Sequence, residues 1–176
     1  MSALLAVEEG YRFSSGTRRR LRPVRGSSVN NKWLEPSLVL AVFFSDRLFK
    51  FFILKRLYLK SAEVLPFFKL TYVENTGVAF GMFRGVNSFF IVLSAVLIAA
   101  LLIFRRNHPV RPPAVAAGLA LVLGGALGNL YDRLAYGFVV DFFDFSFFPA
   151  VFNVADSAIT AGAVLLALGL NKTSGQ

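Results

Sequence analysis

The sequence predicts a membrane α-helical protein, in which a four-transmembrane-helix bundle carries a small β-cradle on the outer side of the membrane. Composition is the first reason, because 56% of the residues are hydrophobic, only 16% are charged, and the mean hydropathy is +0.61. Such values are too apolar for an ordinary soluble domain. The second reason is the presence of four apolar stretches whose lengths approach what is needed to cross about 30 Å of hydrocarbon.

The four stretches differ in polarity. The first contains Asp46, Arg47 and Lys50, the second has no charge, and the third is rich in glycine and alanine. Their expected bounds are Pro36 to Leu54, Val86 to Phe104, Ala114 to Leu130, and Ala150 to Leu170. Four helices that span a membrane are the simplest interpretation.

Two segments between these stretches predict β-structure. Residues 58–83 are too polar to span, and "FFKLTYVEN" places Phe68, Leu70 and Tyr72 on one side at a period of two. Residues 137–148, "GFVVDFFDFSFF", are dense in Phe and Val. We expect both on the outer membrane surface, where aromatic side chains are favoured.

The distribution of Lys and Arg predicts the orientation. Seven of the 19 basic residues precede Leu34, and with the N-terminus inside, eleven lie in inner segments and six in outer ones. This asymmetry favours both termini in the cytoplasm. The expected organisation is a basic cytoplasmic extension (1–33), a transmembrane domain (34–171) and a cytoplasmic tail (172–176). The same topology accounts for the net charge of +9 without nucleic acid as a partner.

Several chemistries are excluded by composition. The chain has no Cys, which removes thiolate nucleophiles and thiolate metal sites, and His108 alone builds no multi-histidine metal site. The motif "RRNHPVRPP" instead indicates a solvated loop around His108. We therefore expect neither a metal nor another cofactor.

Polar residues within the stretches fall near one plane when the predicted topology is applied. Asp46 and Lys50 lie toward the outer end of the first stretch. The other two sets lie at the outer ends of the third and fourth: Asn129, Asp132 and Arg133, and Asn153 and Asp156. Within each set the spacing of three or four residues places the side chains on one helix face. Gly124 and Gly128 form a small-xxx-small pair, which permits close helix approach.

Neither Asp141 nor Asp156 has a basic residue within four positions, so no local ion pair accounts for either carboxylate. If they are buried near each other, their like charges separate their proton affinities. An ionised and a protonated carboxyl are what aspartic peptidase chemistry requires. For Asp46 with Lys50, and for Arg133, a structural role in ion pairs is the simpler hypothesis.

Five ordered motifs extend this interpretation to a family. The chain resembles the bacterial lipoprotein signal peptidases, or signal peptidase II, over about Leu38 to Leu170. The resemblance rests on "SDRLFK", "NTGVAF", "GNLYDR", "VVDFFDF" and "FNVADS". It implies an inner-membrane aspartic endopeptidase that cleaves diacylglyceryl-modified prolipoproteins just before the lipidated cysteine.

The resemblance also implies roles for individual residues. Asp141 and Asp156 correspond to the catalytic pair. Residues that surround or support substrate and dyad are Asn75, Asn129, Arg133, Asn153, Asp46 and Lys50. Asp132 and Asp144 are expected to be structural, with Asp144 exposed on the outer loop. The implied partners are the prolipoprotein and membrane lipid, and a monomer is expected.

Other functions remain open at this stage. A transporter or channel subunit would use intramembrane carboxylates along a whole path, but the inner halves of the second and third stretches are almost wholly apolar. A Ser/Lys peptidase would use Ser157 with Lys50 as its base. A non-enzymatic scaffold is the third alternative.

Overall fold

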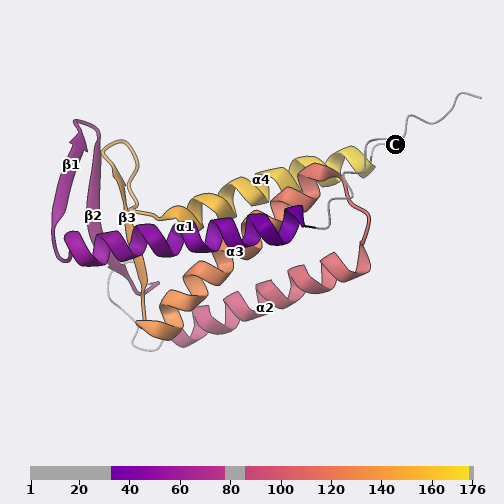
Figure 1. The fold of residues 1–176 in the computed structure, drawn as a ribbon, viewed down its shortest axis with the longest axis horizontal. Coiled ribbons are helices and arrows are strands. Elements are labelled where there is room, and N and C mark those ends of the chain that lie inside the picture. The colour runs from indigo at the N-terminus through magenta and orange to yellow at the C-terminus, as the bar shows by residue number, and fades with distance from the viewer. Residues whose placement is uncertain (1–32, 78–85, 175–176) are drawn as a thin grey trace, which may run out of the picture.

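The computed structural model describes residues 33–77 and 86–174, where four long helices lie beside one another and carry a small sheet at one end (Figure 1). Of the predicted N-terminal extension, only Trp33 lies within the described residues. The elements in chain order are α1 (Leu34–Arg56), β1 (Ser61–Leu65), β2 (Phe68–Asn75), α2 (Val86–Asn107), α3 (Pro113–Ala135), β3 (Val139–Phe145) and α4 (Val154–Ser174).

Three of the four helices in the described part of the chain, α2, α3 and α4, are long and apolar enough to cross a membrane. Helix α2 leaves Phe89, Val92 and Val96 exposed, which suits a surface covered by lipid rather than water. The remaining helix, α1, has 23 residues and is about 34 Å long, but it carries buried Asp46 and Lys50. Apolarity therefore identifies three spans, and α1 is distinguished from them by its charges.

Helix α3 forms the centre of the bundle, where it packs against α1, α2 and α4. Glycines permit its close contacts, as the Gly124 and Gly128 pair predicts. A Cβ at Gly124 would lie 2.9 Å from the carbonyl oxygen of Val39 in α1, and one at Gly128 would lie 2.8 Å from Asp46 Oδ2. Close approach of α1 to α3 therefore brings Asp46 against the α3 backbone.

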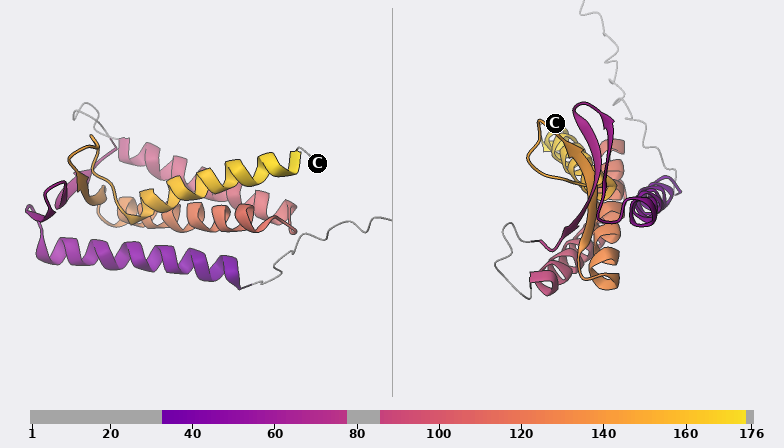
Figure 2. Two further views of the ribbon diagram at one scale, coloured as in Figure 1. Left: turned by 90° about the horizontal axis from the view of Figure 1, so that it is seen from above. Right: turned by 90° about the vertical axis from the view of Figure 1, so that its left-hand side faces the viewer.

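The sheet is antiparallel with strand order β1-β2-β3, and its strands lie inside the two segments predicted to form β-structure. Phe68, Leu70 and Tyr72 are less exposed than Lys69 between them, as their period of two predicts. Strand β2 pairs with β3, and the register of this pairing shifts between Leu70 and Val73 of β2. The sheet lies where α1 and α3 end and α4 begins, as the two views in Figure 2 show.

Most helix ends differ from the expected bounds, and two of these differences concern local capping. Helix α3 continues to Ala135, and the chain then turns at Gly137, whose φ of +84° favours glycine. Helix α4 begins at Val154 rather than Ala150, because Asn153 caps it and Phe152 bridges to Phe143 of β3. These two turns bring β3 across the end of the bundle.

Candidate functional site

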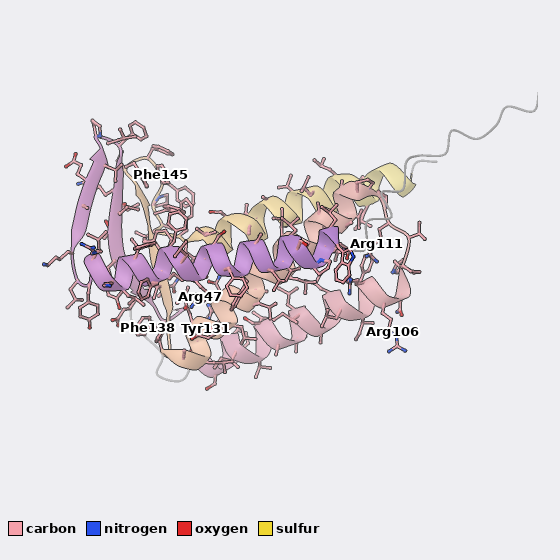
Figure 3. All side chains as sticks on the ribbon, viewed as in Figure 1. Arg47, Arg106, Arg111, Tyr131, Phe138 and Phe145 are labelled. Carbon is pink, nitrogen blue, oxygen red and sulfur yellow. The ribbon has the colours of Figure 1, made fainter. Side chains whose placement is uncertain are left out.

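Every predicted site residue lies at the sheet end of the bundle, although they come from five different elements and one connecting segment. Asp46 and Lys50 lie on α1, Asn129 and Arg133 on α3, and Asp156 on α4. The remaining three lie on β2, on β3 and immediately before α4: Asn75, Asp141 and Asn153. Figure 3 places the Phe145 and Arg47 side chains toward this end and those of Arg106 and Arg111 toward the other.

Asp141 is buried, with 1% of its surface exposed, and is bound by two amide donors. Asn153 Nδ2 donates to Asp141 Oδ1 at 2.6 Å, and Asn75 Nδ2 donates to Oδ2 at 2.8 Å. Burial and the nearby charge of Asp156 together raise the pKa of Asp141 to about 6, although the two amides act in the opposite direction. The two hydrogen bonds partly compensate the desolvation of the carboxylate.

Asp156 lies in the first turn of α4 and is held by different donors. Asn129 Nδ2 donates to its Oδ1 at 2.7 Å, and the backbone N–H of Asn153 lies 3.3 Å from its Oδ2. A carboxylate near a helix N-terminus is favoured by the partial positive charge of the unpaired N–H groups. The position on α4 therefore stabilises a negative charge that the sequence leaves without a basic neighbour.

Asn153 connects the two aspartates through opposite ends of its amide. Its Oδ1 accepts from the backbone N–H of Asp156 at 2.9 Å, which is the N-cap interaction expected of Asn. Its Nδ2 therefore faces β3, where it also approaches the carbonyl oxygen of Val140 at 3.3 Å. The cap orients the amide so that a donor meets Asp141.

The amide of Asn75 is oriented by a local turn. The backbone N–H of Gly77 donates to Asn75 Oδ1 at 2.8 Å, which leaves Nδ2 directed to Asp141. Gly77 has a φ of +83°, and a Cβ there would lie 2.2 Å from the ring of Phe90. The turn therefore requires glycine, and the remainder of the "NTGVAF" motif, residues 78–80, lies outside the described residues.

Four charged side chains form a quartet beside the aspartates, in which Asp46, Lys50 and Asp132 are buried and Arg47 is half-buried. Lys50 Nζ lies 2.9 Å from Asp46 and 2.7 Å from Asp132, and Arg47 lies 2.8 and 2.5 Å from the same two carboxylates. Lys50 also donates to Asn129 Oδ1 at 3.1 Å, which orients the Nδ2 of Asn129 toward Asp156. The two cations and two carboxylates make the quartet neutral. Through Lys50 it also positions Asn129 Nδ2, one of the four hydrogen-bond donors to Asp141 and Asp156.

The quartet also joins the elements to one another. Asp46 Oδ1 accepts the backbone N–H of Ala155 at 3.1 Å, and Asp132 Oδ2 accepts that of Val140 at 3.1 Å. Ala155 immediately precedes Asp156, and Val140 immediately precedes Asp141. Each carboxylate of the quartet therefore fixes the backbone beside one aspartate of the candidate pair.

Arg133 has a less direct relation to the pair. Its guanidinium lies 5.0 Å from the centre of the Phe90 ring and donates to the carbonyl oxygen of Asn129 at 3.4 Å. Its charge interacts with Asp141 and Asp156, but within the described residues no hydrogen bond joins it to either carboxylate. Asn87 Nδ2 donates to the Arg133 carbonyl oxygen at 3.2 Å and so joins α2 to this end of α3.

Two expectations about charged residues need correction or addition. Asp144 lies within β3 rather than on an exposed loop, where it is half-buried and accepts from Thr71 Oγ1 at 2.9 Å. Strand pairing opposite Lys69 explains this position.

Arg47 was not expected to belong to the site. It is adjacent to Asp46 in the sequence, and a spacing of three or four residues, which the sequence analysis used to find residues on one helix face, does not pair the two. Only the approach of α3 brings Asp132 to Arg47.

Among the residues that the structure describes, no group of three or more His, Cys, Asp or Glu side chains is arranged to hold a metal ion. The fold and the site together define an integral membrane protein with two amide-bound aspartates at one end of its helices.

The comparisons with known proteins assign the chain to a family. The profile of signal peptidase (SPase) II matches residues 38–172, which is most of the chain. The chain belongs to the signal peptidase II family, as the five sequence motifs predict.

Relatives and solved structures agree with this assignment. The lipoprotein signal peptidase of Caldanaerobacter subterraneus is 47% identical over 73% of this chain and 90% of its own length. That of Symbiobacterium thermophilum is 44% identical over 76% of this chain and 93% of its own. A bacterial membrane enzyme solved by the in meso method at 2.3 Å resolution superposes with a TM-score of 0.74 and 30% identity, covering 82% of this chain and 91% of that one.

Proposed function

We propose that this signal peptidase II uses Asp141 and Asp156 as an aspartic dyad to remove signal peptides from diacylglyceryl-modified prolipoproteins, cleaving just before the lipidated cysteine. The observation that carries the proposal is the arrangement of the asparagine amides. Asn153 and Asn75 donate to Asp141, and Asn129 donates to Asp156. Each carboxyl is thereby held by neutral amide donors, which form hydrogen bonds to it but bring no positive charge to cancel its own.

The reaction that follows from this site is a hydrolysis in which one carboxyl is ionised and the other protonated. The ionised carboxylate takes a proton from a water molecule, whose oxygen bonds to the scissile carbonyl carbon. The protonated carboxyl donates a hydrogen bond to the carbonyl oxygen as that oxygen gains charge. The C–N bond then breaks, and a dyad proton passes to the departing amine. The raised pKa of Asp141 supports a proton that the pair shares, and Asp141 is taken as the group that holds it.

The contacts of Lys50 argue against a Ser/Lys peptidase. A lysine that acts as a base must lose a proton, but Lys50 has three acceptors within 3.1 Å, two of which are carboxylates. These acceptors engage the ammonium group, and Ser157 is not among them. Ser157 Oγ donates to the carbonyl oxygen of Asn153 at 2.9 Å, which is an ordinary helix contact for serine.

We propose that α1 also spans the membrane and completes a four-helix transmembrane bundle. It packs against α3 and α4. Burial of the neutral quartet against these helices removes its charges from lipid. In the proposed topology both termini face the cytoplasm. The sheet and the aspartates then lie at the outer leaflet of the cytoplasmic membrane, where the diacylglyceryl group of a substrate resides. The basic residues of segment 1–33 support this orientation.

The same proposal covers the expected partners and organisation. Its substrate is a lipidated polypeptide presented by the membrane, and the protein acts as a monomer without nucleic acid or a cofactor. Residues 34–171 form the peptidase domain, with the 58–83 and 137–148 segments on the outer side. The apolar and aromatic surface around Phe68, Phe145 and Phe147 suits contact with acyl chains at that interface.

The direct test uses purified protein in detergent, a diacylated prolipoprotein and a gel shift that reports loss of the signal peptide. Asp141→Asn and Asp156→Asn keep the size of the side chain and remove its ionisable group. Each is expected to lower turnover by at least about 10² to 10⁴, the usual contribution of general acid–base catalysis.

Matched variants separate this mechanism from its rivals. Asp144→Asn makes the same chemical change in the same strand and should retain most activity, as should Ser157→Ala. A chelator should not inhibit. Substantial activity in either dyad variant, combined with its loss in Ser157→Ala or on chelation, would overturn the aspartic proposal.

A further inference from the structure

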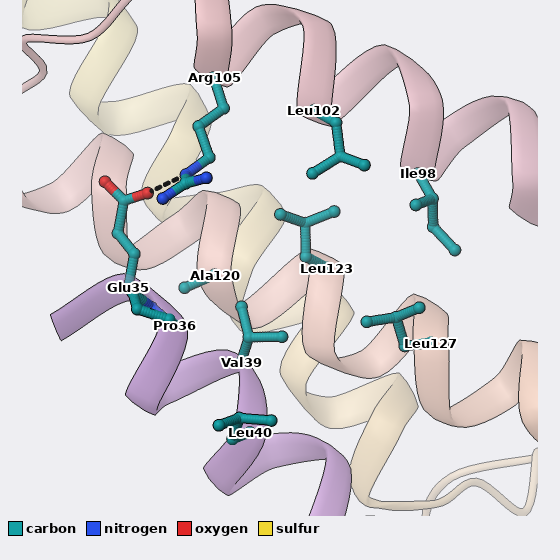
Figure 4. A pocket seen from close by; sticks show the side chains of 10 residues that line it. All are labelled: Glu35, Pro36, Val39, Leu40, Ile98, Leu102, Arg105, Ala120, Leu123 and Leu127. Atoms are coloured by element: carbon teal, nitrogen blue, oxygen red, sulfur yellow. Dashed lines mark hydrogen bonds and ion pairs between the residues drawn. The ribbon is translucent and has the colours of Figure 1, made fainter. Parts of the chain in front are cut away.

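An apolar cavity of about 330 Å³ lies between the first half of α1, the last half of α2 and α3, and none of the predicted site residues lines it. Its walls include Val39, Leu40, Ile98, Leu102 and Leu123 (Figure 4). Helices α1 and α2 both pack on α3, which forms the floor of this groove. The side chains of Leu40 and Leu102 are 54% and 48% exposed, so the groove opens to the surroundings of the bundle.

One end of the groove is ionic, whereas the rest is hydrocarbon. Glu35 of α1 accepts from Arg105 Nε at 2.7 Å and is also ion-paired with Arg111. Two arginines thus bind a single carboxylate, which leaves a local excess of positive charge.

Arg105 has donors that the ion pair does not use. Its contact with Glu35 engages Nε, and within residues 33–77 and 86–174 no hydrogen bond engages its two terminal nitrogens. The Arg105 side chain is 45% exposed and also lines the groove. A guanidinium with two such nitrogens matches the geometry of a phosphate.

We propose that this groove binds an anionic phospholipid, with one acyl chain along Leu40, Leu102 and Leu123 and its phosphate against Arg105. Charge complementarity selects the occupant, because an apolar groove alone accepts any acyl chain, whereas the arginine excess favours an anionic headgroup. The ionic end of the groove lies at the end of the bundle opposite the aspartates, so in the proposed topology the headgroup belongs to the other leaflet from the proposed substrate. This site is independent of peptide cleavage.

Brominated lipids, which quench tryptophan on contact, provide the test. The only tryptophan of the chain, Trp33, is replaced by Phe, and a reporter is introduced as Leu40→Trp in the groove. Leu168→Trp on α4 is the control, because Leu168 is exposed and lies six residues before the end of α4, as Leu40 lies six residues after the start of α1. The protein is reconstituted in phosphatidylcholine with a small fraction of brominated phosphatidylglycerol or brominated phosphatidylcholine.

The expected result is a preference for the anionic lipid of about fivefold at Leu40→Trp, which is the factor for one basic residue near a lipid surface, and none at Leu168→Trp. Arg105→Gln should abolish the preference, and Arg106→Gln, the same change one residue along, should retain most of it. Glu35→Gln breaks the ion pair but keeps the Arg105 charge, so it should preserve or increase the preference. This last variant separates a headgroup ligand from a structural clamp.

Native mass spectrometry provides a second readout that introduces no tryptophan. Phosphatidylglycerol adducts should survive on the unmodified protein longer than phosphatidylcholine adducts, and Arg105→Gln should remove the difference. The proposal would be overturned in favour of non-specific lipid contact by either of two results. One is an equal preference for the anionic lipid at Leu40→Trp and Leu168→Trp, and the other is an equal loss of that preference in Arg105→Gln and Arg106→Gln. Displacement of the quencher by a synthetic signal peptide would instead assign the groove to the substrate and equally overturn it.

Discussion

Asn153 Nδ2 lies 2.6 Å from Asp141 Oδ1, and this contact joins the cap of α4 to the middle of β3. The same asparagine accepts the backbone N–H of Asp156. One residue therefore begins the helix that carries one aspartate and holds the side chain of the other. Its two functions are separable, because Ser also caps helices well but its side chain is too short to reach Asp141.

Substitution of Asn153 tests that separation. We expect Asn153→Ala to lose about 1 to 2 kcal/mol of stability through the cap and to lower activity strongly. Asn153→Ser should keep most of the stability but show the same loss of activity. Thermal unfolding in detergent and the prolipoprotein gel shift measure the two properties. Full activity in Asn153→Ser would show that the amide contact with Asp141 is dispensable.

The amide of Asn75 predicts a change in pH dependence. If Asp141 holds the shared proton, kcat/KM falls as pH rises through its pKa of about 6. Asn75 lowers that pKa by stabilising the carboxylate, so Asn75→Ala should move the alkaline limb to higher pH. Thr71→Val removes a neighbouring hydrogen bond to Asp144 and serves as the control. A limb that stays in place in Asn75→Ala would contradict this role of Asp141.

The quartet predicts that replacing Lys50 lowers the stability of the protein much more than replacing Lys55, another lysine on α1. Lys50→Met leaves Asp46 and Asp132 with Arg47 alone, and breaking a buried ion pair typically costs about 3 to 5 kcal/mol. Lys55→Met is the same substitution at an exposed position and should have little effect. Thermal unfolding of both variants measures the difference. Similar midpoints for the two would mean that the quartet contributes little to stability.

Single cysteines test the proposed topology, because the chain has none of its own. Glu63 lies exposed in β1, and Asn107 lies exposed at the end of α2, at opposite ends of the bundle. In intact cells an impermeant thiol reagent should label Glu63→Cys and leave Asn107→Cys unlabelled until the membrane is opened. The reverse pattern would place the aspartates on the cytoplasmic side.

Much of this protein was determined by the sequence alone. Hydrophobic stretches predicted where the helices lie, since a span must satisfy its own backbone in lipid. The alternation around Leu70 predicted a strand. Five motifs together predicted the family, and the resemblance proposed Asp141 and Asp156, neither of which has a basic residue within four positions, as the catalytic pair.

Tertiary structure decided the contacts between elements. The pairing of Arg47 with Asp132 follows from the approach of α3 to α1 at Gly124 and Gly128, and no local spacing encodes it. The position of Asp144 depended on strand register, which a one-residue shift would reverse. The orientation of each asparagine amide depended on what its oxygen accepts, such as Lys50 for Asn129. Sequence periodicity determines the face of a single helix or strand, whereas the partner across a contact is determined only when elements distant in the chain pack together.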